Sequence, residues 1–176
     1  MMARIRLLLV DDHEVVRSGL RMLLENEADL KIVGEASTGR QALEMVAALK
    51  PDVVIMDITL PDISGIEATR RIKEAHPEVA VVALTIHEDQ QYFFEMLQVG
   101  ASGYVPKRAA PDDLITAIRA THRGEMYIYP SLAKLLVGDF LSRSSEEDAK
   151  EFMIDHSGDS MVKFDDVTME MLKSLD

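Results

Sequence analysis

The chain lacks cysteine and tryptophan entirely, and only four tyrosines and five phenylalanines supply its aromatic side chains. Without cysteine it has no disulfide and no thiolate metal ligand, a composition expected of a protein in the reducing cytoplasm. Long apolar segments are also lacking. The longest stretch free of Asp, Glu, Lys and Arg is residues 96–106, which is 11 residues, whereas a helix that spans a membrane needs about 20. We therefore expect no membrane span.

Basic residues are scarce relative to acidic ones. The 19 Lys and Arg residues against 31 Asp and Glu residues give a net charge of 19 − 31 = −12. Because binding to nucleic-acid phosphates needs clustered Lys and Arg, we expect nucleic acid to be an improbable partner. The acidic excess is concentrated in residues 144–176, which hold ten acidic and three basic residues. We expect this acidic C-terminal extension to be helical or partly disordered.

Residues 1–125 alternate apolar runs with segments of helical periodicity. Five runs are expected to be strands: residues 5–10, 30–36, 53–56, 79–85 and 103–105. Most of them are apolar throughout instead of alternating, which indicates burial on both faces. The pattern predicts an α/β fold, a doubly wound five-stranded parallel sheet with helices on both faces.

Polar residues follow the expected strands at the edge where such sheets bind ligands. They are Asp11, Asp12, Asp57, Thr85 and Lys107. Carboxylates without thiolates suit a hard cation such as Mg²⁺. Together with a lysine and a hydroxyl they predict a site for phosphoryl transfer, where catalysis consists mostly of positioning and charge neutralisation. Asp57 is the natural nucleophile, since an aspartate can form an acyl phosphate.

These residues lie in motifs that resemble the response-regulator receiver domain, the aspartate-phosphorylated half of bacterial two-component systems. The motifs are residues 8–13, 54–61, Gly65, 83–85 and 103–107, and the resemblance covers roughly residues 4–125. The sequences at residues 85–89, 123–125 and 129–133 are most similar to the NarL/FixJ (LuxR-type) subfamily. The resemblance implies a flavodoxin-like receiver fold.

The resemblance also implies roles for individual residues. Asp57 would accept a phosphoryl group from a histidine kinase in a Mg²⁺-dependent reaction. The receiver itself would catalyse this transfer and the later hydrolysis without being a metabolic enzyme. The implied metal ligands are Asp11, Asp12, Asp57 and the backbone carbonyl of Thr59. Lys107 would contact the phosphoryl group, and Thr85 and Tyr104 would form the pair of switch residues.

The C-terminal part departs from the subfamily, whose members usually carry a helix-turn-helix after the receiver. No such signature is found after Leu141. The expected organisation is a receiver domain at 1–125, a linker helix at 126–143 and the acidic extension at 144–176. The extension has 33 residues, fewer than the about 40 that usually fold unaided. We therefore expect a truncated, degenerate or replaced output domain.

Two other functions stay open at this point. One is a DNA-binding transcriptional regulator with a truncated or degenerate output domain. The other is an interaction module that no longer needs phosphorylation, although carboxylates held together without use would only destabilise a fold. A homodimer is also possible. A haloacid-dehalogenase phosphatase is disfavoured, because that family has a second aspartate where this chain has Thr59.

Overall fold

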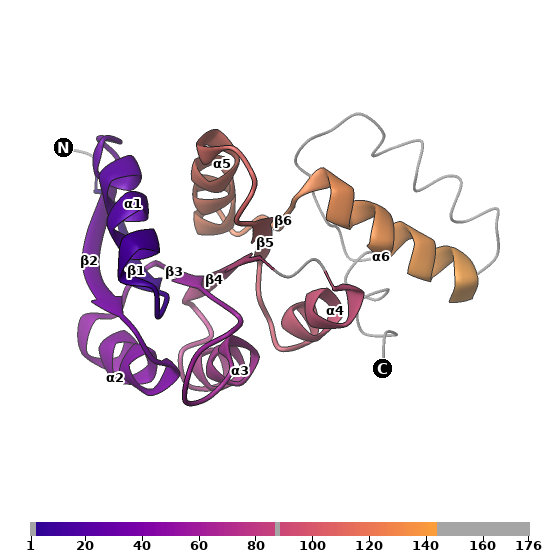
Figure 1. The fold of residues 1–176 in the computed structure, drawn as a ribbon, viewed down its shortest axis with the longest axis horizontal. Helices are drawn as coiled ribbons and strands as arrows, with labels where there is room; N and C mark the ends of the chain where they lie inside the picture. Colours follow the sequence, from indigo (N-terminus) through magenta and orange to yellow (C-terminus); the bar gives the residue numbers. More distant parts are fainter. Residues whose placement is uncertain (1–2, 87–88, 144–176) are drawn as a thin grey trace.

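The computed structural model describes residues 3–86 and 89–143, and the expected acidic extension at 144–176 lies outside the described residues. Strands and helices alternate along the chain (Figure 1). The elements are β1 (Ile5–Val10), α1 (Glu14–Glu25), β2 (Leu30–Ala36), α2 (Gly39–Leu49), β3 (Val53–Met56), α3 (Gly65–Ala75), β4 (Ala80–Thr85), α4 (Gln90–Gln98), β5 (Gly103–Pro106), α5 (Pro111–His122), β6 (Tyr127–Ile128) and α6 (Pro130–Arg143). No helix within the described ranges is both long and apolar enough to cross a membrane.

The strands form one sheet in the order β2-β1-β3-β4-β5-β6, and every neighbouring pair is parallel. Helices α1 and α5 cover one face, and α2, α3 and α4 cover the other (Figure 1). The chain first adds β2 on one side of β1 and then adds β3 on the other side. This order confirms the predicted doubly wound fold, and its change of direction between β1 and β3 is where such sheets bind ligands.

The sheet has six strands, so the prediction of five was wrong by one. Strand β6 pairs with β5 through Gly103↔Tyr127 and Tyr104↔Ile128. It is two residues long, and Pro130 soon follows. A segment this short has no apolar run or alternation from which a strand can be predicted.

Side chains of the central strands alternate between two cores. One core faces α1 and α5 and includes Leu7, Leu9, Val53, Ile55, Val82 and Val105. The other faces α2, α3 and α4 and includes Leu8, Val10, Val54, Met56, Val81 and Tyr104. Burying each large apolar side chain contributes about 1.5–3 kcal/mol, so both faces hold the strands, and hence the strand ends, in fixed positions.

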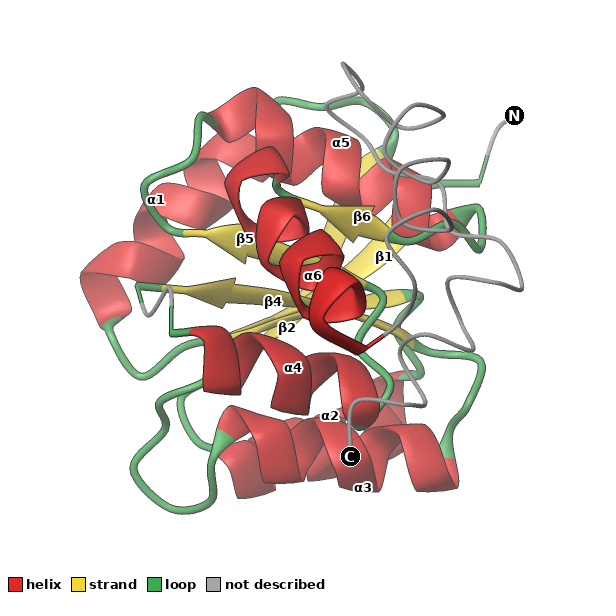
Figure 2. Ribbon diagram, turned by 90° about the vertical axis from the view of Figure 1, so that its right-hand side faces the viewer, coloured by secondary structure: helices red, strands yellow, loops and turns green. Residues whose placement is uncertain are grey.

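Helix α6 lies beside β6 and α4 at the edge of the sheet (Figure 2). Its residues Leu132 and Leu136, one turn apart, are buried in the same core as Phe93 of α4 and Tyr104 of β5. The backbone N–H of Tyr129 donates to the carbonyl of Tyr104 at 3.1 Å. The helix is therefore attached to the receiver at the strand that carries Tyr104.

Candidate functional site

Asp11 and Asp57 meet because they follow neighbouring parallel strands. Val10 of β1 and Met56 of β3 are paired in register, so the next residue of each strand reaches the same edge. The backbone N–H of Asp57 donates to the carbonyl of Val10 at 3.0 Å, which fixes the strand end. Asp11 is 2% exposed and Asp57 is 4% exposed. Two carboxylates are thus buried side by side.

Lys107 balances part of this negative charge. Its Nζ lies 2.7 Å from Oδ2 of Asp11 and 3.4 Å from Oδ2 of Asp57. The lysine follows β5, and its backbone N–H donates to the carbonyl of Thr85 at 2.7 Å. Side chains at the ends of three strands therefore meet at one edge of the sheet, and we call the place where Asp11, Asp57 and Lys107 meet the pocket.

The pKa of Asp57 is raised. The largest cause is burial, which disfavours the charged carboxylate. The ammonium of Lys107 acts in the opposite direction, and the carboxylate of Asp11 raises the pKa further. The ionised form of Asp57 is consequently unfavourable in this setting, and a bound cation would stabilise it.

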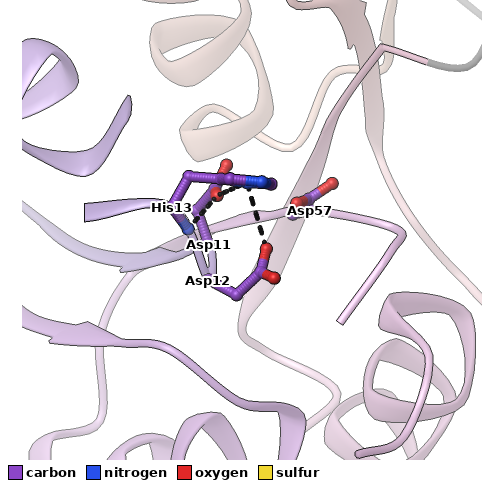
Figure 3. A group of neighbouring side chains, drawn as sticks. All are labelled: Asp11, Asp12, His13 and Asp57. Carbon is purple, nitrogen blue, oxygen red and sulfur yellow. Dashed lines mark hydrogen bonds and ion pairs between the residues drawn. The ribbon is translucent and has the colours of Figure 1, made fainter. Parts of the chain in front are cut away.

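Asp12 and His13 complete the cluster (Figure 3). Nδ1 of His13 lies 3.1 Å from Oδ1 of Asp11 and 3.2 Å from Oδ1 of Asp12. Each of the four residues Asp11, Asp12, His13 and Asp57 offers one ligand atom, and these atoms all lie within 4.8 Å of one another. Three of the four offered atoms are carboxylate oxygens, which fit a hard divalent cation such as Mg²⁺. His13 itself is largely exposed, at the rim of the pocket.

The other predicted site residues surround this pocket. Thr59 is exposed in the loop after β3, and its N–H lies 3.4 Å from Oδ1 of Asp57. Thr85 is fully buried at the end of β4. Tyr104 is also fully buried, but within the core, where its ring stands edge-on to Phe93 at 5.1 Å between ring centroids. Tyr104 therefore belongs to the core that faces α2, α3 and α4.

Two residues that position this region carry no signal in the sequence. The guanidinium of Arg17 in α1 donates to the backbone carbonyl of Asp11. The carboxylate of Asp62, in the loop after Asp57, accepts from the backbone N–H groups of Gly39 at 2.8 Å and Arg40 at 2.9 Å. Asp62 thereby caps the first turn of α2 from a distant segment. The Asp62 contact joins distant segments, and the Arg17 contact reaches from a helix back to the preceding turn, so periodicity and motif spacing give no sign of either.

The pKa of Asp62 predicts an acid-sensitive contact. Burial acts to raise it, but the N–H donors of Arg40 and Gly39 outweigh that effect and lower it to about 2, from 3.8. A lowered carboxyl pKa stabilises the fold above the unfolded value of 3.8 and loses this contribution as the pH falls towards 2. We expect Asp62→Ala to lower the free energy of unfolding at pH 7 and to flatten its decline in acid.

Urea unfolding between pH 3 and pH 7 measures both effects. Asp89→Ala is a matched control for helix capping, because Asp89 caps α4 through Gln91 on its own helix and, within the described residues, has no hydrogen bond to another segment. The prediction would be contradicted if the free energy of unfolding of Asp62→Ala fell as steeply with decreasing pH as that of the wild type.

Comparison with known proteins agrees with this geometry. The family of response regulator receiver domains matches residues 7–119. The response regulator GacA of Pseudomonas viridiflava is 42% identical over 132 residues, which are 75% of this chain and 62% of GacA. The response regulator UvrY of Escherichia coli K12 is 42% identical over 130 residues, which are 74% of this chain and 60% of UvrY. The chain thus spans about three fifths of the length of these curated relatives.

Solved structures show the same fold. A two-component response regulator of the LuxR family from Aurantimonas sp. SI85-9A1 has a TM-score of 0.75 and 34% identity, and the match covers 79% of this chain and 99% of that one. The isolated REC domain of RcsB from Salmonella enterica serovar Typhimurium, in the presence of phosphomimetic BeF₃⁻, has a TM-score of 0.70 and 27% identity, with 75% and 98% covered. The strand order, the aspartate pocket and the match over residues 7–119 establish that this chain belongs to the response regulator receiver domain family, with relatives of the NarL/FixJ type.

Proposed function

We propose that the chain is a phosphorylation-driven switch of a two-component system in the cytoplasm, with Asp57 as the residue that accepts the phosphoryl group from a histidine kinase. The observation that carries the proposal is the position of Asp57. Its carboxylate is buried at the end of β3, next to Asp11 and within 3.4 Å of the Lys107 ammonium. An aspartate in this setting has a fixed orientation, is largely shielded from water and lies close to a cation, which are the conditions that favour phosphoryl transfer.

The transfer exchanges one bond to phosphorus for another. A carboxylate oxygen of Asp57 forms a bond to phosphorus while the bond between phosphorus and the histidine nitrogen of the kinase breaks. Lys107 would contact the oxygens of the phosphoryl group, and Asp57 must be ionised to attack. Hydrolysis of the acyl phosphate later restores the carboxylate. The receiver thus catalyses its own modification and its reversal, without turning over a metabolite.

The metal site is proposed at the same pocket. The residues that would hold Mg²⁺ are Asp11, Asp12, Asp57 and the backbone carbonyl of Thr59. When bound there, Mg²⁺ would offset the negative charge of the carboxylates and of the phosphoryl oxygens. Asp11 is already paired with Lys107 at 2.7 Å, and Asp12 is partly exposed on the solvent side. These positions leave Asp12 and Asp57 as the main metal ligands.

The switch is proposed to run from Thr85 through Tyr104 to α6. A phosphoryl group on Asp57 presents new acceptor oxygens, to which the Thr85 hydroxyl can donate. Thr85 and Tyr104 lie on neighbouring strands, and the Tyr104 ring shares a core with Leu132 and Leu136 of α6. A shift of Tyr104 would therefore change the packing of α6. Phosphorylation needs only to favour one of two existing arrangements.

The route to α6 gives the switch an output within the described chain. Arg108 follows Lys107 directly, lies over the Tyr129 ring at 5.4 Å, and its Nη2 is 3.3 Å from Oγ of Ser131. The loop that carries Lys107 is thus connected to the start of α6 a second time. Release or reorientation of α6 would expose the apolar face next to α4. A second copy of the chain, forming a homodimer, or another output partner would bind there.

Phosphorylation of purified protein by acetyl phosphate tests the proposal. Wild type with Mg²⁺ should gain the mass of one phosphoryl group, and peptide mapping should place it on Asp57. Asp57→Asn keeps the shape but removes the anionic nucleophile, so it should gain none. Asp89→Asn makes the same chemical change at an exposed helix cap and should behave like wild type.

Two outcomes would contradict the proposal. An equal adduct on Asp57→Asn would move the acceptor elsewhere. A wild type that is never phosphorylated would favour an interaction module that works without phosphate. Omission of Mg²⁺, with a chelator present, should suppress the adduct in wild type and in Asp89→Asn.

A further inference from the structure

Arg17 links helix α1 to the turn that carries the acidic pocket. Its backbone N–H continues the helix by donating to the carbonyl of His13 at 3.1 Å. Its guanidinium Nη1 reaches back and donates to the backbone carbonyl of Asp11. The Arg17 side chain is only 16% exposed. An arginine that is mostly buried loses much of its hydration, so its few contacts determine where it lies.

Glu35 of β2 holds the other side of this guanidinium. Nε of Arg17 lies 3.4 Å from Oε1 of Glu35 and is a buried donor without a hydrogen bond in the described part of the chain. The same carboxylate pairs through Oε2 with Nη1 of Arg21. Beside Glu35, the carbonyl of Ala36 accepts from the N–H of Asp11 at 3.0 Å. Strand β2 therefore supports the turn both directly and through Arg17.

The carbonyl that Arg17 binds is part of the peptide joining Asp11 to Asp12. Rotation of that peptide would change the direction of the Asp12 side chain relative to the Asp11 carboxylate. On the other side of the turn, the N–H of His13 donates to Oδ1 of Asp11 at 2.8 Å. The turn is thus held at the Asp11 side chain by His13 and at the Asp11 carbonyl by Arg17.

We propose that Arg17 is a positioning residue for the metal pocket, which sets the relative orientation of Asp11 and Asp12 while Glu35 holds its guanidinium. The inference rests on the proposed Mg²⁺ site. Arg17 does not touch the metal or the phosphoryl group. It acts through the Asp11–Asp12 peptide, as the hydrogen-bond partners of metal ligands do in other sites.

Arg21 offers a matched control. It lies one turn further along α1 and forms an ion pair with the same carboxylate of Glu35, but within the described residues it makes no hydrogen bond or ion pair with the Asp11–Asp12 turn. If Arg17 merely ties α1 to the sheet, loss of either arginine should have a similar effect. If Arg17 positions the pocket, only its loss should change the affinity for Mg²⁺.

Isothermal titration with Mg²⁺ alone distinguishes these roles without a phosphoryl donor. Loss of one hydrogen-bond partner of a metal ligand typically costs 10–100-fold in affinity. We expect Arg17→Met to raise the Kd for Mg²⁺ about 10-fold and Arg21→Met to change it less than about 2-fold. Arg17→Lys keeps a cationic donor and should recover part of the lost affinity. Circular dichroism confirms that each variant is folded, and if Arg17→Met is not, Arg17→Lys is compared with Arg21→Lys.

The outcomes separate this inference from the function on which it rests. Wild type that binds Mg²⁺ while Arg17→Met binds equally well would overturn the positioning role alone. Equal losses of Mg²⁺ affinity in the Arg17 and Arg21 variants would show that Arg17 only connects α1 to the sheet. Wild type that does not bind Mg²⁺ would overturn the proposed metal site, and the positioning role with it.

Discussion

Gly65→Ala is expected to destabilise the protein by about 3 kcal/mol, the upper part of the usual range for inserting a methyl group into a filled space. A Cβ at residue 65 would lie 2.0 Å from the carbonyl oxygen of Asp57 and 2.8 Å from Cα of Ile58. Both atoms belong to the backbone, so no side-chain rotation relieves the overlap. The N–H of Gly65 also donates to the carbonyl of Ile58 at 2.7 Å, which keeps the two segments together.

The same substitution should impair phosphorylation, because the clash falls on the residue that carries the acceptor carboxylate. Relief of the overlap requires the backbone of Asp57 to move away from α3, and a displaced nucleophile loses its alignment with the pocket. We expect the rate of modification by acetyl phosphate to fall at least about 10-fold even where the protein remains folded. This second readout is measured at a temperature well below the melting point of the variant.

Gly19→Ala is the matched control. Gly19 lies inside α1, and nothing lies within 4 Å of an added Cβ. Alanine in a helix interior is favoured over glycine by up to about 1 kcal/mol, so this variant should be slightly stabilised. Urea unfolding compares the two. A Gly65→Ala variant as stable as Gly19→Ala would show that the approach of α3 to Asp57 is not tight.

The fold could be predicted largely because its central strands are buried on both faces. Residues 53–56 are all apolar, and the register of parallel strands then requires Asp11 and Asp57 to meet at one edge. The sequence also predicts Lys107 at this edge, in contact with the phosphoryl group. The structure places its Nζ closer to Asp11, at 2.7 Å, than to Asp57, at 3.4 Å. Sequence indicated the strand ends but not the separation of individual atoms.

The features that could not be predicted depend on contacts that form only in the folded chain. Strand β6 exists because Tyr127 and Ile128 lie against β5, and two residues have no periodicity. Arg17 and Asp62 are polar residues, and their positions in the sequence pattern do not differ from those of ordinary surface residues. In the sequence, Gly65 stands out only as part of a motif of the resemblance. The close approach of the Asp57 carbonyl, which explains the glycine, exists only in the folded chain.

The charge of the pocket predicts opposite stability effects of Asp57→Asn with and without Mg²⁺. Burial raises the pKa of Asp57. A raised carboxyl pKa contributes stability that is present below the unfolded value of 3.8 and is lost as the pH rises through the folded value. At pH 8, with a chelator present, the ionised Asp57 therefore opposes folding. Asp57→Asn removes this charge and should melt at a higher temperature than wild type.

Addition of Mg²⁺ should reverse this order. A ligand that binds only the folded state adds RT ln(1 + [L]/Kd), which is about 2.7 kcal/mol at 100 times Kd. Wild type should gain this stability, since Mg²⁺ relieves the repulsion between Asp57 and Asp11. Asp57→Asn and Asp12→Ala, which lack a carboxylate ligand, should gain much less, while the exposed-site control Asp89→Asn should gain as much as wild type. Equal thermal shifts in wild type and Asp12→Ala would rule out Asp12 as a metal ligand. If Mg²⁺ does not stabilise the wild type, the proposal that this pocket binds Mg²⁺ is wrong.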